Sequence, residues 1–140
     1  ENRSQHTYVI VDTSGSCSND IPKFISTVAS AMRNMDCTAT IIECDSEITE
    51  QPKTYKRIPT NKPFDIKGLG GTDMTVALKW IIEKETKNGR MNKCRVVLLS
   101  DALTPWMQIP NGMEITGICP KGYLDTMKKL GGIKYVAEIQ

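Results

Sequence analysis

Oxygen-bearing side chains gather in three short segments that lie far apart in the chain. The segments are Asp-Thr-Ser-Gly-Ser at 12–16, Gly-Gly-Thr-Asp at 70–73 and Ser-Asp at 100–101. Carboxylates and hydroxyls suit a hard divalent cation, with Mg²⁺ as the first candidate and Mn²⁺ or Ca²⁺ as alternatives, whereas zinc prefers histidine or cysteine. The candidate metal ligands are Asp12, Ser14, Ser16, Thr72 and Asp101.

The alternation in the first segment lets one turning loop aim three side chains at a single point, and Gly15 permits the tight curvature. Because the candidate ligands are mainly neutral hydroxyls, a bound ion would keep much of its positive charge. The five side chains leave at least one of about six coordination positions open. Water or an incoming carboxylate would take that position.

Secondary-structure elements must bring the three segments together. Short β-branched runs precede the first and third segments, which is typical of strands buried on both faces. Apolar residues at helical spacing follow the second segment, with Asp73 as a candidate cap and Gly89 as a stop. The predicted strands cover 7–12, 38–44, 47–56, 94–100, 114–119 and 133–139, and the predicted helices run from an Asn19-Asp20 cap to about Met35, from Met74 to about Asn88, and over 123–130.

Strands that alternate with helices predict a doubly wound, Rossmann-like α/β fold. We expect a mostly parallel six-stranded sheet with helices on both faces, and an antiparallel edge strand at 47–56, which contains Pro52. Ligands in such folds bind beyond the carboxyl ends of the strands, where the winding reverses. A lone Asp-x-Ser-x-Ser is commonly a polar turn that caps the next helix, but three segments at strand ends favour a metal site.

Length and composition limit the possible classes of protein. The 140 residues suffice for one domain, 1–140, and 39% hydrophobic with 24% charged residues is typical of a globular protein. A formal charge of +2 gives nucleic-acid binding no support, and the apolar runs fall far short of the roughly 18 residues of a membrane span. Five cysteines without a C-x-x-C pair indicate reduced thiols and a cytoplasmic location. Because the chain opens at Glu1, we expect a domain excised from a longer protein.

Catalytic motifs are absent from the sequence. The single histidine, His6, precedes the first predicted strand, and no phosphate-binding glycine motif or H-E-x-x-H occurs. One rival hypothesis is a Mg²⁺-dependent phosphotransferase or hydrolase with Asp12 as nucleophile, but the acid/base position two residues on is Ser14. Another is a metal-free assembly domain in which Asp12 and Asp101 only cap turns. We therefore expect this domain not to be an enzyme.

The pattern Asp12-x-Ser14-x-Ser16 with Thr72 and Asp101 resembles the metal-ion-dependent adhesion site (MIDAS) of von Willebrand factor A (VWA) domains. Glu-Cys-Asp at 43–45 and Gly-Leu-Gly-Gly-Thr-Asp at 68–73 resemble most closely the VWA-like C-terminal domains of bacterial and phage metallopeptidase-type proteins. One departure is Ala102, which stands where the family usually has glycine.

The resemblance implies a protein-binding module rather than an enzyme. It implies that Ser14, Ser16 and Thr72 coordinate the ion directly, that Asp12 and Asp101 act largely through water, and that a partner's Asp or Glu completes the coordination. It also implies a role as adaptor for an AAA+ ATPase, and a metallopeptidase-like region that would lie outside this chain.

Further residues have two interpretations each. Asp45 and Asp73 either support the metal ligands or begin a turn and cap a helix, respectively. Trp106 either anchors a partner beside the ion or covers the core. A basic run either forms a solvated face or steers an acidic partner or RNA toward the site, and it contains Lys53, Lys56, Arg57, Lys62 and Lys67.

Overall fold

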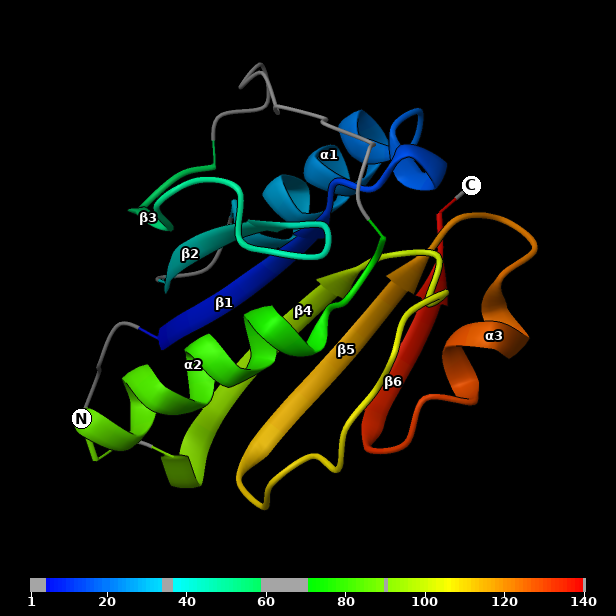
Figure 1. The fold of residues 1–140 in the computed structure, drawn as a ribbon. Helices are drawn as coiled ribbons and strands as arrows, with labels where there is room; N and C mark the ends of the chain where they lie inside the picture. The colour runs from blue at the N-terminus through cyan, green and yellow to red at the C-terminus, as the bar shows by residue number, and fades with distance from the viewer. Residues whose placement is uncertain (1–4, 34–36, 59–70, 90, 140) are drawn as a thin grey trace.

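The computed structural model describes residues 5–33, 37–58, 71–89 and 91–139, which form a six-stranded sheet in the order β3-β2-β1-β4-β5-β6 (Figure 1). All neighbouring strands run parallel except β3, which runs antiparallel to β2 at one edge. The predicted mostly parallel sheet with one antiparallel edge strand is therefore confirmed. The strands are β1 (Gln5–Asp12), β2 (Cys37–Cys44), β3 (Lys53–Tyr55), β4 (Cys94–Leu99), β5 (Met113–Cys119) and β6 (Ile133–Glu138).

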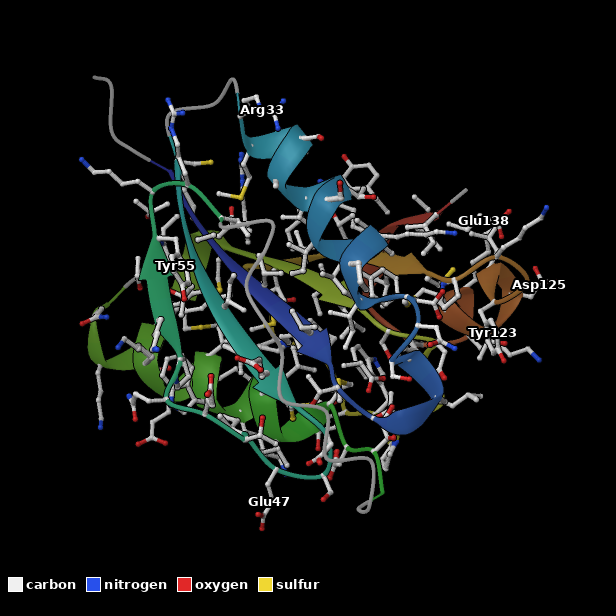
Figure 2. All side chains as sticks on the ribbon, turned by 90° about the horizontal axis from the view of Figure 1, so that it is seen from above. Arg33, Glu47, Tyr55, Tyr123, Asp125 and Glu138 are labelled. Atoms are coloured by element: carbon white, nitrogen blue, oxygen red, sulfur yellow. The ribbon has the colours of Figure 1, made fainter. Side chains whose placement is uncertain are left out.

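Helices cover both faces of the sheet, as predicted. Helix α1 (Ile21–Met32) lies on one face, and α2 (Thr75–Lys87) and α3 (Leu124–Lys128) lie on the other (Figures 1 and 2). Two single 3₁₀ turns, Gly15–Cys17 and Met91–Lys93, were not expected from the sequence. No helix within the described ranges has the length and apolar character needed to cross a membrane.

Two apolar cores flank the central strand β1. Val9 and Val11 pack with Phe24 of α1 on one face, whereas Tyr8 and Ile10 belong to the core beneath α2 on the other. Successive side chains of a strand point to opposite faces, so a strand covered on both sides must be apolar at nearly every position. This double burial explains why the run at 7–12 contains no exposed polar alternation.

The edge strand is shorter than the sequence predicted. Of the run 47–56, only Lys53–Tyr55 pairs regularly with β2, and Cys44 and Ile48 form an isolated bridge. The Asp45 carboxylate accepts a hydrogen bond from the Glu47 N–H at 3.0 Å, which folds the chain into a tight turn directly after β2. Pro52, just before β3, has no N–H to donate to a neighbouring strand.

The helix boundaries also shift slightly. Helix α1 ends at Met32, with Arg33 as its C-cap, rather than near Met35, and residues 34–36 lie outside the described residues. Asp20 precedes the first residue of α1 and a proline occupies the first turn, as the sequence indicated, but the Asp20 side chain makes no capping hydrogen bond. The chain from 100 to 112 crosses from β4 to β5 without a helix.

The strand order places the reversal of winding between β1 and β4. From β1 the sheet grows through β2 and β3 to one side, and through β4, β5 and β6 to the other. Doubly wound folds bind ligands at the carboxyl ends of the two strands that flank this reversal. Those ends carry Asp12 on β1 and Ser100-Asp101 after β4.

Candidate metal centre

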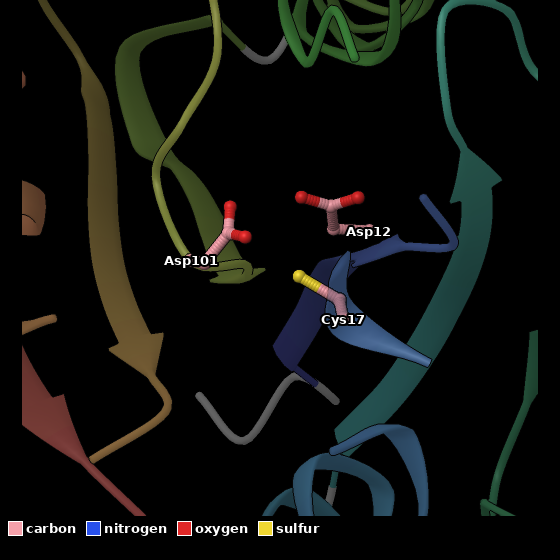
Figure 3. Close-up of side chains that lie close together, drawn as sticks. All are labelled: Asp12, Cys17 and Asp101. Atoms are coloured by element: carbon pink, nitrogen blue, oxygen red, sulfur yellow. The ribbon is translucent and has the colours of Figure 1, made fainter. Parts of the chain in front are cut away.

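Asp12 and Asp101 lie side by side although they are far apart in the sequence. One ligand atom from each, together with the sulfur of Cys17, forms a group whose members lie within 4.8 Å of one another (Figure 3). All three side chains are buried; Asp12 is 0% and Asp101 is 2% exposed. The two predicted carboxylates therefore lie together at the carboxyl ends of β1 and β4, as expected for a doubly wound sheet.

Both oxygens of the Asp12 carboxylate are held by the loops around it. Oδ1 accepts a hydrogen bond from the Ser14 N–H at 2.9 Å, and Oδ2 accepts one from the Ser100 hydroxyl at 2.6 Å. The fully buried Ser100 hydroxyl oxygen also accepts a hydrogen bond from the Ala102 N–H at 3.0 Å. Ser100 thus fastens the end of β1 to the loop after β4, a role that its place in the sequence did not reveal.

The Asp101 carboxylate is held in the same way. Oδ2 accepts a hydrogen bond from the Ser16 hydroxyl at 2.7 Å, and Oδ1 accepts one from the Leu103 N–H at 3.0 Å. The Ser14 and Ser16 hydroxyl oxygens lie 3.2 Å apart. Ser16 is exposed whereas Ser14 and both carboxylates are buried, so Ser16 lies on the solvent-facing side of the cluster.

The third predicted segment reaches the same edge of the sheet. The Asp73 N–H donates to the Asp45 carbonyl after β2 at 2.8 Å, and the Met74 N–H donates to the Thr104 hydroxyl after β4 at 2.8 Å. These two bonds fix the start of α2 between the loops that follow β2 and β4. Thr72, half-buried, lies immediately before this anchored pair.

Asp45 and Asp73 shape the loops around the cluster. The Asp45 side chain starts the turn described above, and its carbonyl holds Asp73. The Asp73 carboxylate accepts hydrogen bonds from the Thr75 N–H at 3.0 Å and from the Thr75 hydroxyl at 2.5 Å, and Thr75 is the first residue of α2. Asp45 therefore begins a turn and Asp73 holds the start of α2, which is one of the two interpretations from the sequence. The other interpretation, that these acids support metal ligands, stays a prediction.

The candidate partner contacts are placed only in part. Trp106 is half-buried, packs against the core on the α2 face and donates from Nε1 to the Gly131 carbonyl at 2.7 Å. These contacts match the alternative in which the tryptophan covers the core, and a partner contact stays a prediction. Lys62 and Lys67 lie outside the described residues.

Cys17 joins the cluster although the sequence favoured apolar packing over thiolate metal binding for it, because buried cysteines are commonly small apolar packing residues. Burial raises the pKa of the Cys17 thiol, and the nearby Asp12 and Asp101 charges raise it further, so the group is a neutral thiol at pH 7. A neutral thiol is a poor ligand for a hard cation. Its position directly after Ser16 was the only available signal, since the 3₁₀ turn Gly15–Cys17 brings it back toward the carboxylates.

The side chains present fit a hard divalent cation. Among the residues that the structure describes, no lysine or arginine forms an ion pair with Asp12 or Asp101. Buried carboxylates are ordinarily paired with a cationic group or coordinate a metal. Two such groups within 4.8 Å of each other, next to two hydroxyls, supply oxygen donors and negative charge for an ion.

Comparisons with known proteins agree with this architecture. The profile of the family described as VWA-like domain (DUF2201) matches residues 7–129. No curated protein matches the sequence. The fold resembles proximal thread matrix protein 1 from the mussel byssus, with a TM-score of 0.65 and 14% identity over 98% of this chain. This chain covers 44% of the mussel protein.

Two further solved structures share the fold. The pilus adhesin SpaC from Lactobacillus rhamnosus GG has a TM-score of 0.58 and 11% identity over 100% of this chain and 28% of its own. The VWA domain of SpRpn10 has a TM-score of 0.51 and 9% identity over 98% of this chain and 88% of its own. At such low identities the likeness concerns the fold alone.

Proposed function

The chain belongs to the family of VWA-like domains described as DUF2201, and from this premise we propose that it is a protein-binding module that captures a partner's carboxylate through a divalent cation. The observation that carries the proposal is the pair of buried carboxylates, Asp12 and Asp101, whose oxygens lie within 4.8 Å of each other. Within the described part of the chain this pair has no cationic partner, and a bound cation would balance it.

The hydrogen bonds support different roles for the carboxylates and the hydroxyls in holding the ion. Each carboxylate already accepts two hydrogen bonds from the loops, which favours contact with the ion through water. The hydroxyls of Ser14, Ser16 and Thr72 are the proposed direct ligands, with Mg²⁺ as the first candidate ion. When bound, the ion would supply a positive charge with an open coordination position, which attracts an acidic side chain.

Charge at this edge of the sheet supports strict dependence on the ion. Asp12 ends β1, and Asp45, Asp73 and Asp101 lie in the neighbouring loops at this edge. Without a cation these four acids would repel an acidic partner, since like charges in a partly dehydrated site interact strongly. A divalent ion would offset part of this negative charge and offer an open coordination position, so capture of an acidic partner would depend on the ion.

The proposed partner is a protein that presents an Asp or Glu. An AAA+ ATPase is the partner class implied by the sequence resemblance, and we propose it as the first to test. Binding is favoured over phosphoryl transfer because Asp12 is fully buried and both of its oxygens accept hydrogen bonds, which a nucleophile would have to give up.

Calorimetric titration of Mg²⁺, Mn²⁺ and Ca²⁺ into chelator-treated protein tests the proposal. We expect one binding event that the double variant Ser14→Ala/Thr72→Ala weakens at least tenfold. The double variant Ser26→Ala/Thr27→Ala is the matched control, because it removes two hydroxyls from the exposed side of α1. Ion binding of equal strength in the Ser14/Thr72 variant and the wild type would refute the assignment.

A further inference from the structure

Leu103 is an exposed apolar side chain at the edge of the candidate metal centre. It is 55% exposed, and in the described part of the chain only Tyr135, at 54%, is a comparably exposed large apolar side chain. The Leu103 N–H lies 3.0 Å from Oδ1 of Asp101. Because Cα is about 1.5 Å from the backbone nitrogen, the Leu103 Cα lies within about 4.5 Å of that carboxylate oxygen.

The residues on either side of Leu103 fix its position. Ala102 is buried in the core on the α2 face and has a φ of 66°, a left-handed conformation that is unusual for a residue with a side chain. The Thr104 hydroxyl accepts the Met74 N–H at the start of α2. With both neighbours fixed, Leu103 is held at the surface in one backbone conformation rather than on a freely moving loop.

An exposed apolar side chain held next to an ion site is suited to a particular partner chemistry. A partner whose acidic residue reaches the ion must also place its neighbouring side chains near Leu103. A polar neighbour would leave Leu103 hydrated, whereas an apolar neighbour would remove apolar surface from water on both sides. Preorganisation of Leu103 lowers the entropic cost of that contact.

We propose that Leu103 determines specificity: the segment bound at the ion carries an apolar side chain next to its acidic residue, and that side chain packs against Leu103. This inference rests on the proposed function, since it needs the ion to position the acidic residue. Burial of about half a leucine side chain corresponds to roughly a tenfold preference in affinity.

A pair of seven-residue peptides provides the first test. Both carry a central glutamate, flanked on each side by leucine in one peptide and by serine in the other, and binding is followed by fluorescence anisotropy in Mg²⁺ and in EDTA. We expect the wild type to prefer the leucine peptide about tenfold in Mg²⁺. Leu103→Ser should lower the preference to about twofold or less while keeping the dependence on Mg²⁺ and on the glutamate.

Tyr135→Ser is the matched control, because it removes an equally exposed apolar side chain from β6, outside the candidate metal centre. This variant should keep the wild-type preference. The inference is overturned if the wild type binds both peptides equally in Mg²⁺, or if Leu103→Ser keeps the tenfold preference. If neither peptide binds, or if EDTA does not affect binding, the proposed function itself fails, and the inference about Leu103 fails with it.

Discussion

Replacement of Asp101 by asparagine should stabilise the ion-free protein and abolish its response to divalent cations. The two carboxylate oxygens lie within 4.8 Å of each other, and two unit charges at that separation repel each other by about 3.5 kcal/mol at an effective dielectric constant of about 20. Asparagine removes this repulsion from Asp12 and has nearly the same shape. Its Oδ1 can accept from the Leu103 N–H as the carboxylate does, and its Nδ2 can donate to the Ser16 hydroxyl.

Part of the gain is lost because hydrogen bonds to a neutral amide are weaker than those to a carboxylate. We therefore expect the free energy of unfolding in EDTA to rise by about 1–2 kcal/mol, which corresponds to a Tm increase of roughly 3–6 °C for a chain of this size. In a divalent cation at a hundred times its Kd, the wild type should gain about 2.7 kcal/mol, whereas Asp101→Asn should gain almost nothing.

Urea denaturation at pH 7, in EDTA and in Mg²⁺, measures both effects. Glu83→Gln is the control for the loss of one negative charge, because Glu83 is 71% exposed and pairs with Lys87 on the surface of α2. Its stability should change by less than about 0.5 kcal/mol in either buffer. The reasoning about paired carboxylates is refuted if Asp101→Asn is less stable than the wild type in EDTA, or if it keeps the full response to Mg²⁺.

Three further predictions concern the fold. Tyr8→Phe removes a buried hydrogen bond to the Glu85 carboxylate and should cost roughly 1.5–3 kcal/mol in urea denaturation; an unchanged midpoint would contradict it. Gly132→Ala combines a φ of 85° with a new Cβ that would lie 2.7 Å from Ile109, so the Tm should fall by several degrees, and an unaltered Tm would contradict the close contact. Burial raises the pKa of the Cys44 thiol to about 12, and all five cysteines are buried, so Ellman's reagent at pH 8 should react only after urea is added; rapid reaction of the native protein would contradict this.

The sequence predicted the elements well where burial and backbone chemistry act locally. Apolar β-branched runs such as 7–12 indicate strands that are buried on both faces. The sequence Asn19-Asp20-Ile-Pro indicates the start of a helix. The position of the candidate site followed from a topological rule, because the ends of parallel strands at the reversal of winding must meet. Asp12 and Asp101 could therefore be paired from the amino-acid sequence alone.

Contacts set by the exact path of a loop could not be predicted in this way. The bond from Ser100 to Asp12 and the approach of Cys17 depend on how two loops curl after their strands. Neither loop has a periodic pattern that reports side-chain direction. The length of β3 was overestimated for a similar reason, since the turn from Asp45 to Glu47, closed by one backbone and one side-chain hydrogen bond, takes up the first residues of the predicted strand.

The central position of β1 has a consequence for how the protein folds. This first strand pairs with β2 on one side and with β4 on the other, and the bond that joins Asp12 to Ser100 spans 88 positions of the chain. Contacts over such separations form late, because the entropy of closing a long loop must be overcome first. During synthesis, β1 has only one of its two neighbours until β4 emerges from the ribosome. The two carboxylates come together only after β1 and β4 have paired. An ion bound between them would therefore stabilise the folded protein relative to partly folded chains.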